Sequence, residues 1–285
     1  MTLKVEPVSK AVGARVTGLD LSQPLDDATV AEIKAAWMEH QVLVFPDQDF
    51  TEDEQIRFSR YFGEFPTRER YEHRAEKDTA DKSIMLVSNI RKNGVPIGSL
   101  PDGEMMFHTD GAYDEEPYNY TLLFAVELPS TGGNTLFSNM YKTYEALPDD
   151  LKRKLADCTA EQAYYSGTVQ RGDNVGRYSG GFSHPVFIEH YETGRTALYI
   201  SRLLTMRINE LAEQESNEIL EFLFDHTEKP EFIYEHVWSV GDFVMWDNRC
   251  INHARTDFPR SERRLLRRNV IKGRRPERAR VDAAA

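Results

Sequence analysis

The chain has 285 residues, a net charge of −12 and 40% hydrophobic residues, a composition that is ordinary for a globular protein with a substantial core and argues against disorder. Its two cysteines, Cys158 and Cys250, follow no zinc or redox spacing, which argues against a disulfide framework or a thiolate metal site and favours a reducing compartment. No apolar run has the length of a signal peptide or of a membrane span, roughly 18 residues, so we expect a cytoplasmic protein without membrane contact.

The first quarter of the chain mixes short strands with helices. Thr51-Glu52-Asp53-Glu54 is a capping box, in which the threonine hydroxyl accepts from an early helical amide while the last glutamate reaches back, and it predicts a helix to about Phe62. The other segments predict a strand at residues 13–18, a helix at 27–39 and a buried strand at 42–45. No linker rich in proline, glycine or serine interrupts the chain, so we expect a single domain over residues 1–285.

Residues 63–107 are charged, with one clear strand at 84–87, and this composition predicts lid-like loops over the mouth of a barrel. The elements expected after them are an apolar strand, a turn, a short strand and two short helices, at residues 121–126, 129–134, 135–137, 140–146 and 149–157.

The second half of the chain predicts two hairpins, one helix and a last strand at about 264–272. The hairpins join residues 184–188 to 196–200 and residues 232–238 to 243–246. The helix runs from about residue 210 to 224 and is expected to bury Leu211, Ile219, Leu220, Phe222 and Leu223. Many short strands, few helices and no repeating strand–helix alternation predict a mainly β fold with helical insertions, a double-stranded β-helix (jelly roll, cupin-like).

Residues 255–285 form a basic C-terminal strand and tail. Eleven lysines and arginines lie between residues 255 and 280 against three acidic residues, so the rest of the chain is strongly acidic. A nucleic-acid footprint would need a recognisable reading motif beside its basic surface, and the acidic body would repel phosphate. We therefore expect no nucleic-acid partner, and we expect most of these arginines to be solvated.

His108 and Asp110 form the first candidate for a metal site. Two residues apart on a strand, they lie on one face, and a histidine with a carboxylate suits Fe(II) with positions left open for oxygen. The spacing alone is weak evidence, because roughly one such pair is expected by chance and the chain has three. The other two, at residues 190–192 and 226–228, lie in a polar turn and at a helix end, where structural roles are favoured.

A second histidine must come from a distant part of the sequence if two facing sheets hold the ion, and His253 is best placed. Here the chain resembles a known family, the Fe(II)/2-oxoglutarate-dependent dioxygenases of the taurine dioxygenase and phenoxyacetate dioxygenase group. The resemblance runs from residue 13 to about residue 273 and rests on the motifs Phe107-His108-Thr109-Asp110, Glu127-Leu128-Pro129-Ser130-Thr131-Gly132-Gly133-Asn134-Thr135, Trp246-Asp247-Asn248-Arg249, His253, Arg264 and Arg268. Their separations make the combination specific.

The resemblance implies that His108, Asp110 and His253 bind Fe(II), and that Thr135 and Arg264 hold the distal carboxylate of 2-oxoglutarate. A guanidinium pairs two-pronged with a carboxylate and a threonine hydroxyl adds a donor, which agrees with these roles. It also implies a reaction with O2 that yields succinate and CO2 and hydroxylates an unactivated C–H bond of a small, anionic organic substrate. Relatives that halogenate carry a small residue at the position of Asp110, so we expect hydroxylation.

The resemblance says less about the substrate. Arg268 lies four residues after Arg264, so a strand turns both toward one face, and in relatives this position binds the anionic group of the substrate. A carboxylate, sulfonate or sulfate is therefore expected, and pairing of Arg268 with a structural carboxylate is the alternative. Arg263 and Arg267 fall on the opposite face and are expected to be solvated. The further candidates for substrate contact are Arg68, Tyr71, Glu104 and Leu204.

Two other classes of function compete with the oxygenase. A jelly-roll protein that binds a metal or small anion without redox chemistry would keep the histidines but need neither Thr135 nor Arg264. A nucleic-acid binder using residues 255–280 would bind with a steep salt dependence and would lose nothing on iron chelation. A homo-oligomeric assembly is also expected.

Overall fold

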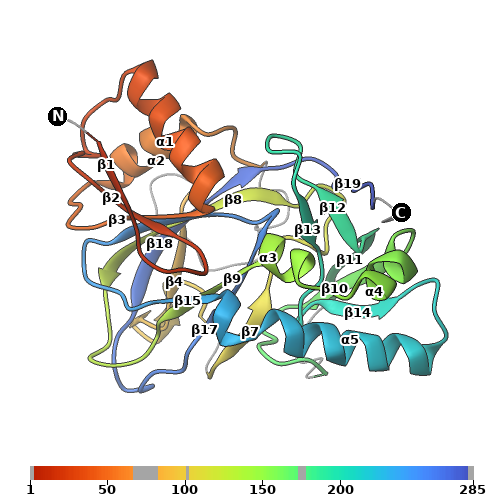
Figure 1. Cartoon of the computed structure of the whole chain (residues 1–285). Helices are drawn as coiled ribbons and strands as arrows, with labels where there is room; N and C mark the ends of the chain where they lie inside the picture. Colours follow the sequence, from red (N-terminus) through yellow and green to blue (C-terminus); the bar gives the residue numbers. More distant parts are fainter. Residues whose placement is uncertain (1–2, 67–82, 101–102, 173–177, 282–285) are drawn as a thin grey trace.

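Two facing β-sheets form the centre of the molecule (Figure 1). The computed structural model describes residues 3–66, 83–100, 103–172 and 178–281. The larger sheet has seven strands, in the order β1 (Lys4–Pro7), β2 (Ala14–Thr17), β3 (Val42–Phe45), β16 (Phe243–Asp247), β8 (Tyr118–Glu127), β18 (Leu265–Lys272) and β4 (Met85–Ser88). The smaller sheet has four, in the order β15 (Ile233–His236), β9 (Thr135–Asn139), β17 (Ile251–Arg255) and β7 (Met105–His108).

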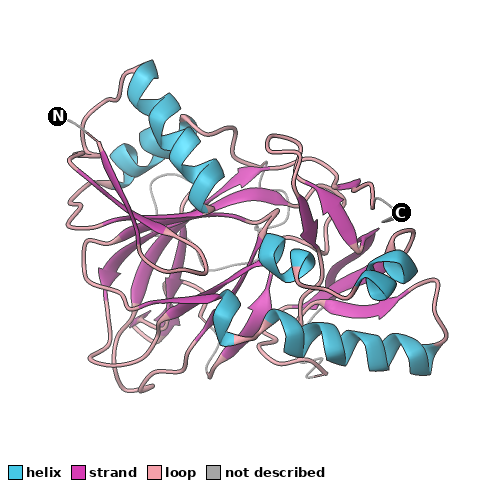
Figure 2. Cartoon of the chain, viewed as in Figure 1, coloured by secondary structure: helices cyan, strands magenta, loops and turns pink. Residues whose placement is uncertain are grey.

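Three minor sheets and the helices complete the fold. The minor sheets are β11 (Tyr178–Pro185), β10 (Thr159–Tyr165) and β14 (Thr205–Ile208); β13 (Thr196–Leu198), β12 (Phe187–Glu189) and β19 (Glu277–Arg278); and β5 (Arg91–Lys92) with β6 (Val95–Pro96). The helices are α1 (Asp27–His40), α2 (Glu52–Arg60), α3 (Met140–Glu145), α4 (Asp149–Leu155), α5 (Glu213–Thr227) and the 3₁₀ turn η1 (Pro230–Phe232). The predicted mainly β fold with few helical insertions is confirmed (Figure 2).

Both faces of the seven-stranded sheet are buried, and β8 shows why. Successive side chains of a strand point to opposite faces. Leu123 and Ala125 pack in the core cluster that includes Phe137 of the four-stranded sheet. Leu122 and Phe124 pack in a second cluster with residues of α1 and α2. The inner face therefore meets the other sheet, while the outer face is covered by helices (Figure 2).

The predicted capping box is present at the start of α2. The Thr51 hydroxyl accepts a hydrogen bond from the Glu54 amide at 3.3 Å, and the Glu54 carboxylate accepts one from the Thr51 amide at 2.7 Å. These bonds satisfy amides that the first helical turn leaves without partners. The helix ends at Arg60, two residues earlier than predicted.

The hairpin predicted between residues 232–238 and 243–246 is wrong. β15 pairs with β9 in the smaller sheet, whereas β16 pairs with β3 and β8 in the larger one. The turn between them therefore carries the chain from one sheet to the other. The prediction that Phe222 of α5 is buried is also wrong, because its side chain is 47% exposed. Leu220, Leu223 and Phe224 form the buried face of the helix.

The expectation that Arg267 is solvated is also wrong, because Arg267 is buried. Arg267 does point away from the inner face, but α2 and its flanking loop cover that side of the sheet. Its guanidinium lies 4.6 Å from the centre of the Phe124 ring and donates to the Phe50 carbonyl. The Gln55 side chain of α2 in turn donates to the backbone of Arg267. Arg263 is exposed and pairs with Glu127, as a solvated arginine would.

The region predicted as lid-like loops is only partly described. Within it, β4 forms an edge of the seven-stranded sheet, and β5 and β6 form a small hairpin. Arg68 and Tyr71 lie outside the described residues. Among the residues that the structure describes, no helix is both long and apolar enough to span a bilayer.

Candidate metal centre

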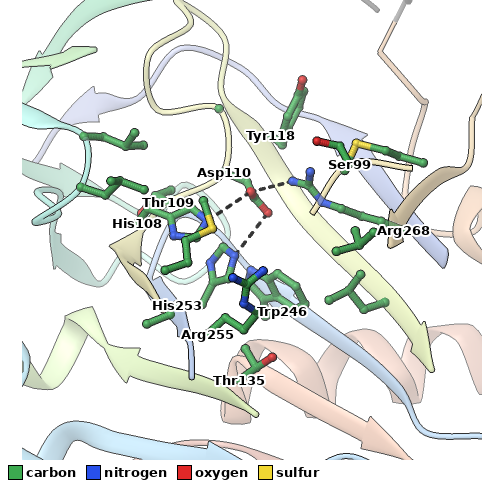
Figure 3. A pocket seen from close by; sticks show the side chains of 18 of the residues that line it. Ser99, His108, Thr109, Asp110, Tyr118, Thr135, Trp246, His253, Arg255 and Arg268 are labelled. Carbon is green, nitrogen blue, oxygen red and sulfur yellow. Dashed lines mark ion pairs between the residues drawn. The ribbon is translucent and has the colours of Figure 1, made fainter. Parts of the chain in front are cut away.

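His108 and His253 are brought side by side by the pairing of two strands. β7 and β17 run antiparallel, and His108 and His253 are direct partners in the register. Their ring centres lie 4.1 Å apart. Asp110 follows two residues after His108, with its carboxylate oxygens 3.9 Å from His108 Nε2 and 3.8 Å from His253 Nε2 (Figure 3). The three groups offer ligand atoms that all lie within 4.8 Å of one another, so one ion could bind all three.

The protonation of these groups suits a cation. Burial lowers the pKa of both imidazoles, which keeps them neutral with a lone pair to share. His108 Nδ1 faces the Met106 carbonyl at 2.9 Å, and because a carbonyl only accepts, Nδ1 carries the proton and Nε2 is the free donor atom. Burial would raise the pKa of Asp110, but the adjacent Arg268 guanidinium holds this pKa well below its usual value. Two nitrogens and one carboxylate with open positions fit Fe(II).

A second polar cluster, made of Thr135, Arg255 and Arg264, faces the same cavity as the metal ligands. Thr135 and Arg255 are direct partners in the pairing of β9 with β17, and Arg264 comes from the start of β18. All three line the cavity that also holds His108, Asp110 and His253. Burial, together with the nearby charge of Arg255, lowers the pKa of Arg264 to about 9. A desolvated guanidinium and a hydroxyl that face the same cavity can together recognise a carboxylate.

The surroundings fix the orientation of Thr135 and Arg264. The indole N–H of Trp238 donates to the Thr135 hydroxyl oxygen at 3.0 Å, which leaves the hydroxyl proton available to another acceptor. Arg264 Nη2 donates to the Gly133 carbonyl at 3.0 Å. Gly133 has φ +67°, and a Cβ there would lie 3.1 Å from Arg264 Nε. The turn before β9 therefore needs glycine both for its backbone and for the space that the guanidinium takes.

Arg255 was missed by the sequence reasoning, which placed it in the basic C-terminal segment and gave it no role of its own. It is 7% exposed and lines the cavity. The signal was present, because Arg255 lies two residues after His253 and a strand turns both side chains to the same face. Buried Arg255, Arg264 and Arg267 are not available to a phosphate backbone, which argues against the nucleic-acid alternative.

The remaining predicted substrate residues divide into two groups. Arg268 and Leu204 line the cavity, whereas Glu104 is exposed and does not. Arg268 Nη2 lies 2.6 Å from Asp110 Oδ1 (Figure 3). Arg268 thus pairs with a carboxylate, as the alternative expectation had it, but this carboxylate belongs to Asp110, one of the three candidate metal ligands. The rest of the cavity is largely apolar and includes Met85, Val87, Leu100, Met105, Leu123, Leu203 and the stacked rings of Tyr113 and Tyr164.

A second group of potential metal ligands, His190, Asp247 and Cys250, is fully buried. Here the carboxylate is already satisfied, because Asp247 accepts from His190 Nε2 at 2.9 Å and from Arg249 Nε and Nη2 at 2.8 and 2.6 Å. Burial raises the pKa of the Cys250 thiol, so it is not a thiolate. This cluster is structural: Asp247 forms an ion pair with Arg249 at the end of β16, and its hydrogen bond with His190 joins β16 to the turn after β12.

We expect Asp247→Asn to destabilise the fold by about 3 kcal/mol at pH 7, because the Arg249 guanidinium loses its fully buried carboxylate partner and keeps only the half-exposed Glu192 carboxylate at 2.7 Å. Burial would raise the pKa of Asp247, but Arg249 holds it below the ordinary value. The stabilisation is therefore present at neutral pH and is lost on acidification below about pH 4. Urea unfolding of the wild type and the variant at pH 7 and at about pH 2 tests both statements. Equal stability of the variant and the wild type at pH 7 would contradict the first.

Comparison with known proteins gives one consistent result. The profile of the family described as "Taurine catabolism dioxygenase TauD, TfdA family" matches residues 4–269. Pentalenolactone F synthase of Streptomyces avermitilis is 38% identical over 91% of this chain and 90% of its own length. The (S)-phenoxypropionate/alpha-ketoglutarate-dioxygenase of Sphingobium herbicidovorans is 33% identical over 94% of each chain.

Solved structures give the same picture. A taurine dioxygenase from Burkholderia xenovorans superimposes with a TM-score of 0.81 at 27% identity, over 96% of this chain and 92% of that one. The structure of AAD-2 in complex with Mn(II) and N-oxalylglycine superimposes with a TM-score of 0.79 at 29% identity, over 97% of this chain and 99% of that one.

Proposed function

This chain belongs to the taurine catabolism dioxygenase TauD, TfdA family, and from that premise we propose which residues perform its chemistry and what class of substrate it takes. Membership gives the reaction class: the protein is an Fe(II)- and 2-oxoglutarate-dependent dioxygenase, an oxidoreductase that uses O2 to hydroxylate its substrate. Membership also decides against the non-redox alternative.

His108, Asp110 and His253 hold the iron. The observation that supports this role is their convergence from β7, from β17 and from the turn that follows β7, with neutral imidazoles and an ionised carboxylate. When bound with 2-oxoglutarate, the iron supplies the oxygen-activating chemistry that yields succinate and CO2 and oxidises a C–H bond. The protein residues hold the ion, keep the site largely buried and fix where the other reactants lie.

Thr135 and Arg264 hold the distal carboxylate of 2-oxoglutarate. The single observation that carries the proposed function is that this buried cation and hydroxyl face the same cavity as the metal cluster. The cavity therefore offers both a metal site and a carboxylate anchor, as a 2-oxo dicarboxylic acid needs. Arg255, opposite Thr135, adds positive potential near this anchor.

The substrate is a small organic anion, a carboxylate, sulfonate or sulfate, with an apolar body. Arg268 supplies the positive charge, because its side chain lines the cavity beside the metal ligands. The leucines, methionines and paired tyrosines of the cavity suit an apolar body better than a polar one. Because Arg268 touches an iron ligand, the bound anion would lie near the metal, so the oxidised carbon is expected close to the anionic group.

A screen for succinate release tests the function and the substrate class together. We expect stimulation by apolar-bodied carboxylates, sulfonates or sulfate esters, and little by matched neutral esters or by small polar amino acids. Product mass should show one added oxygen or fragmentation. A protein that releases succinate only with neutral or cationic compounds would contradict the proposed substrate class but not the reaction class.

Arg268→Gln separates binding of the substrate from binding of 2-oxoglutarate. The KM for the anionic substrate is expected to rise by about 10- to 150-fold, because a hydrogen bond to a charged group contributes about 1.5–3 kcal/mol. The dissociation constant of 2-oxoglutarate, measured anaerobically without substrate, should change little. An unchanged substrate KM would mean that Arg268 serves Asp110 alone.

A further inference from the structure

Asp110 accepts a hydrogen bond from Thr121, a residue that does not line the cavity. The Thr121 hydroxyl lies 2.6 Å from Asp110 Oδ2, and Thr121 is fully buried in β8. Arg268 contacts the other oxygen, Oδ1, at 2.6 Å. The two contacts differ in kind, because Arg268 lines the cavity and can turn to an incoming anion, whereas Thr121 is not among the described residues that line it.

The hydrogen bonds behind Thr121 determine where its proton points. The Trp246 indole N–H can only donate, and it lies 3.0 Å from Asn248 Oδ1. The Asn248 amide must therefore direct its Nδ2 to the Thr121 hydroxyl, at 3.0 Å. With its oxygen accepting from Asn248, the Thr121 hydroxyl donates its proton to Asp110. We call this chain of hydrogen bonds, from Trp246 through Asn248 and Thr121 to Asp110, the relay. Each of its donors and acceptors has one consistent assignment, which also settles the orientation of the Asn248 side-chain amide.

The members of the relay are almost completely buried. Thr121 is 0% exposed, while Asn248 and Trp246 are each 1% exposed. The backbone N–H of Asn248 donates to the Asn119 carbonyl at 2.8 Å, which fixes the backbone of Asn248 beside β8. The ring of Trp246 packs against His253 with ring centres 4.7 Å apart. Trp246 therefore contacts His253 directly by packing, and it reaches Asp110 indirectly through Asn248 and Thr121.

We propose that Thr121, held by Asn248 and Trp246, is a positioning residue that fixes the Asp110 carboxylate for metal binding. The inference rests on the proposed role of Asp110 as an iron ligand. Groups that hydrogen-bond to a ligating side chain orient it, and their loss typically weakens metal binding by about 10–100-fold. The effect of Thr121 reaches the metal only through Asp110, so it is present before 2-oxoglutarate or substrate binds.

The test is a titration of the full chain with Mn(II) alone, in which the free ion is followed by its electron paramagnetic resonance signal. Thr121→Val keeps the shape of the side chain and removes the hydroxyl, and its dissociation constant for Mn(II) is expected to rise by about 10–100-fold. Thr121→Ser keeps a hydroxyl and should bind near the wild-type value. Thermal unfolding of the metal-free proteins checks that each variant is folded.

A double-mutant cycle tests the relay itself. If Asn248 acts through Thr121, Asn248→Ala should weaken Mn(II) binding in the wild type and change it little in the Thr121→Val background. Should Thr121→Val not fold, Asn248→Ala alone decides the matter, because the relay predicts weaker Mn(II) binding for it also.

Asp110→Ala, titrated in the same series, separates the two ideas. If Asp110→Ala binds Mn(II) like the wild type, the proposed metal site is wrong. If Asp110→Ala loses Mn(II) while Thr121→Val and Asn248→Ala bind it normally, the metal site stands and the relay is overturned.

Discussion

Replacing Asp110 with alanine is expected to abolish hydroxylation and the visible charge-transfer band that anaerobic Fe(II) and 2-oxoglutarate should give with the wild type. The variant loses the only carboxylate of the cluster and leaves two neutral imidazoles. It also leaves Arg268 without the carboxylate that it contacts at 2.6 Å, so this contact no longer offsets a positive charge close to the place of the ion. The loss of metal affinity should exceed the roughly 10–100-fold loss that follows when a residue hydrogen-bonded to a metal ligand is removed.

A surface carboxylate nearby provides the control for Asp110. Glu115 pairs with Arg275 at 3.4 Å and both side chains are well exposed. An exposed pair of this kind contributes little, so Glu115→Ala should bind iron and turn over like the wild type. A normal band or normal turnover in Asp110→Ala would remove the role that we assign to this residue.

Replacing Arg264 with methionine is expected to raise the KM for 2-oxoglutarate by about 30- to 5,000-fold, because truncating one partner of a buried charge pair costs about 2–5 kcal/mol. Arg264 is 2% exposed, so little water can replace the lost contact. Arg264→Lys should lie between, since an ammonium keeps the charge but not the planar fork. Steady-state kinetics at varied 2-oxoglutarate and an anaerobic titration measure the effect.

The adjacent arginine is the matched control for Arg264. Arg263 is exposed and lies 2.7 Å from Glu127 at the surface. Arg263→Met removes an equal charge one residue away and should leave the KM for 2-oxoglutarate nearly unchanged. Similar effects of the two substitutions would indicate a general effect of charge and would count against a specific carboxylate anchor.

Local signals in the sequence predicted local structure well. The capping box at Thr51 predicted α2, and the apolar run at residues 42–45 predicted β3 with its bounds. In both cases the physical cause lies within a few residues, in the satisfaction of helical amides or in the burial of both strand faces. Such segments can be assigned without knowledge of their partners.

Errors arose where the answer depends on what another segment does. A turn between two apolar strands does not say whether the strands pair, and β15 and β16 belong to different sheets. Periodicity places Arg267 opposite Arg264, but not under α2. The same limit applied to Arg255, since its face was predictable and its neighbours were not. No local pattern joins His253 to His108, so their pairing was inferred from the need for a distant second histidine and from the resemblance.

A crystal structure with Mn(II) and N-oxalylglycine tests the central claim most directly, since AAD-2, which superimposes on this chain, has been solved with both. We predict one metal ion bonded to His108 Nε2, His253 Nε2 and the Asp110 carboxylate, with the distal carboxylate of N-oxalylglycine on Arg264 and Thr135. A metal bound elsewhere, or an inhibitor whose carboxylate avoids Arg264, would contradict this account.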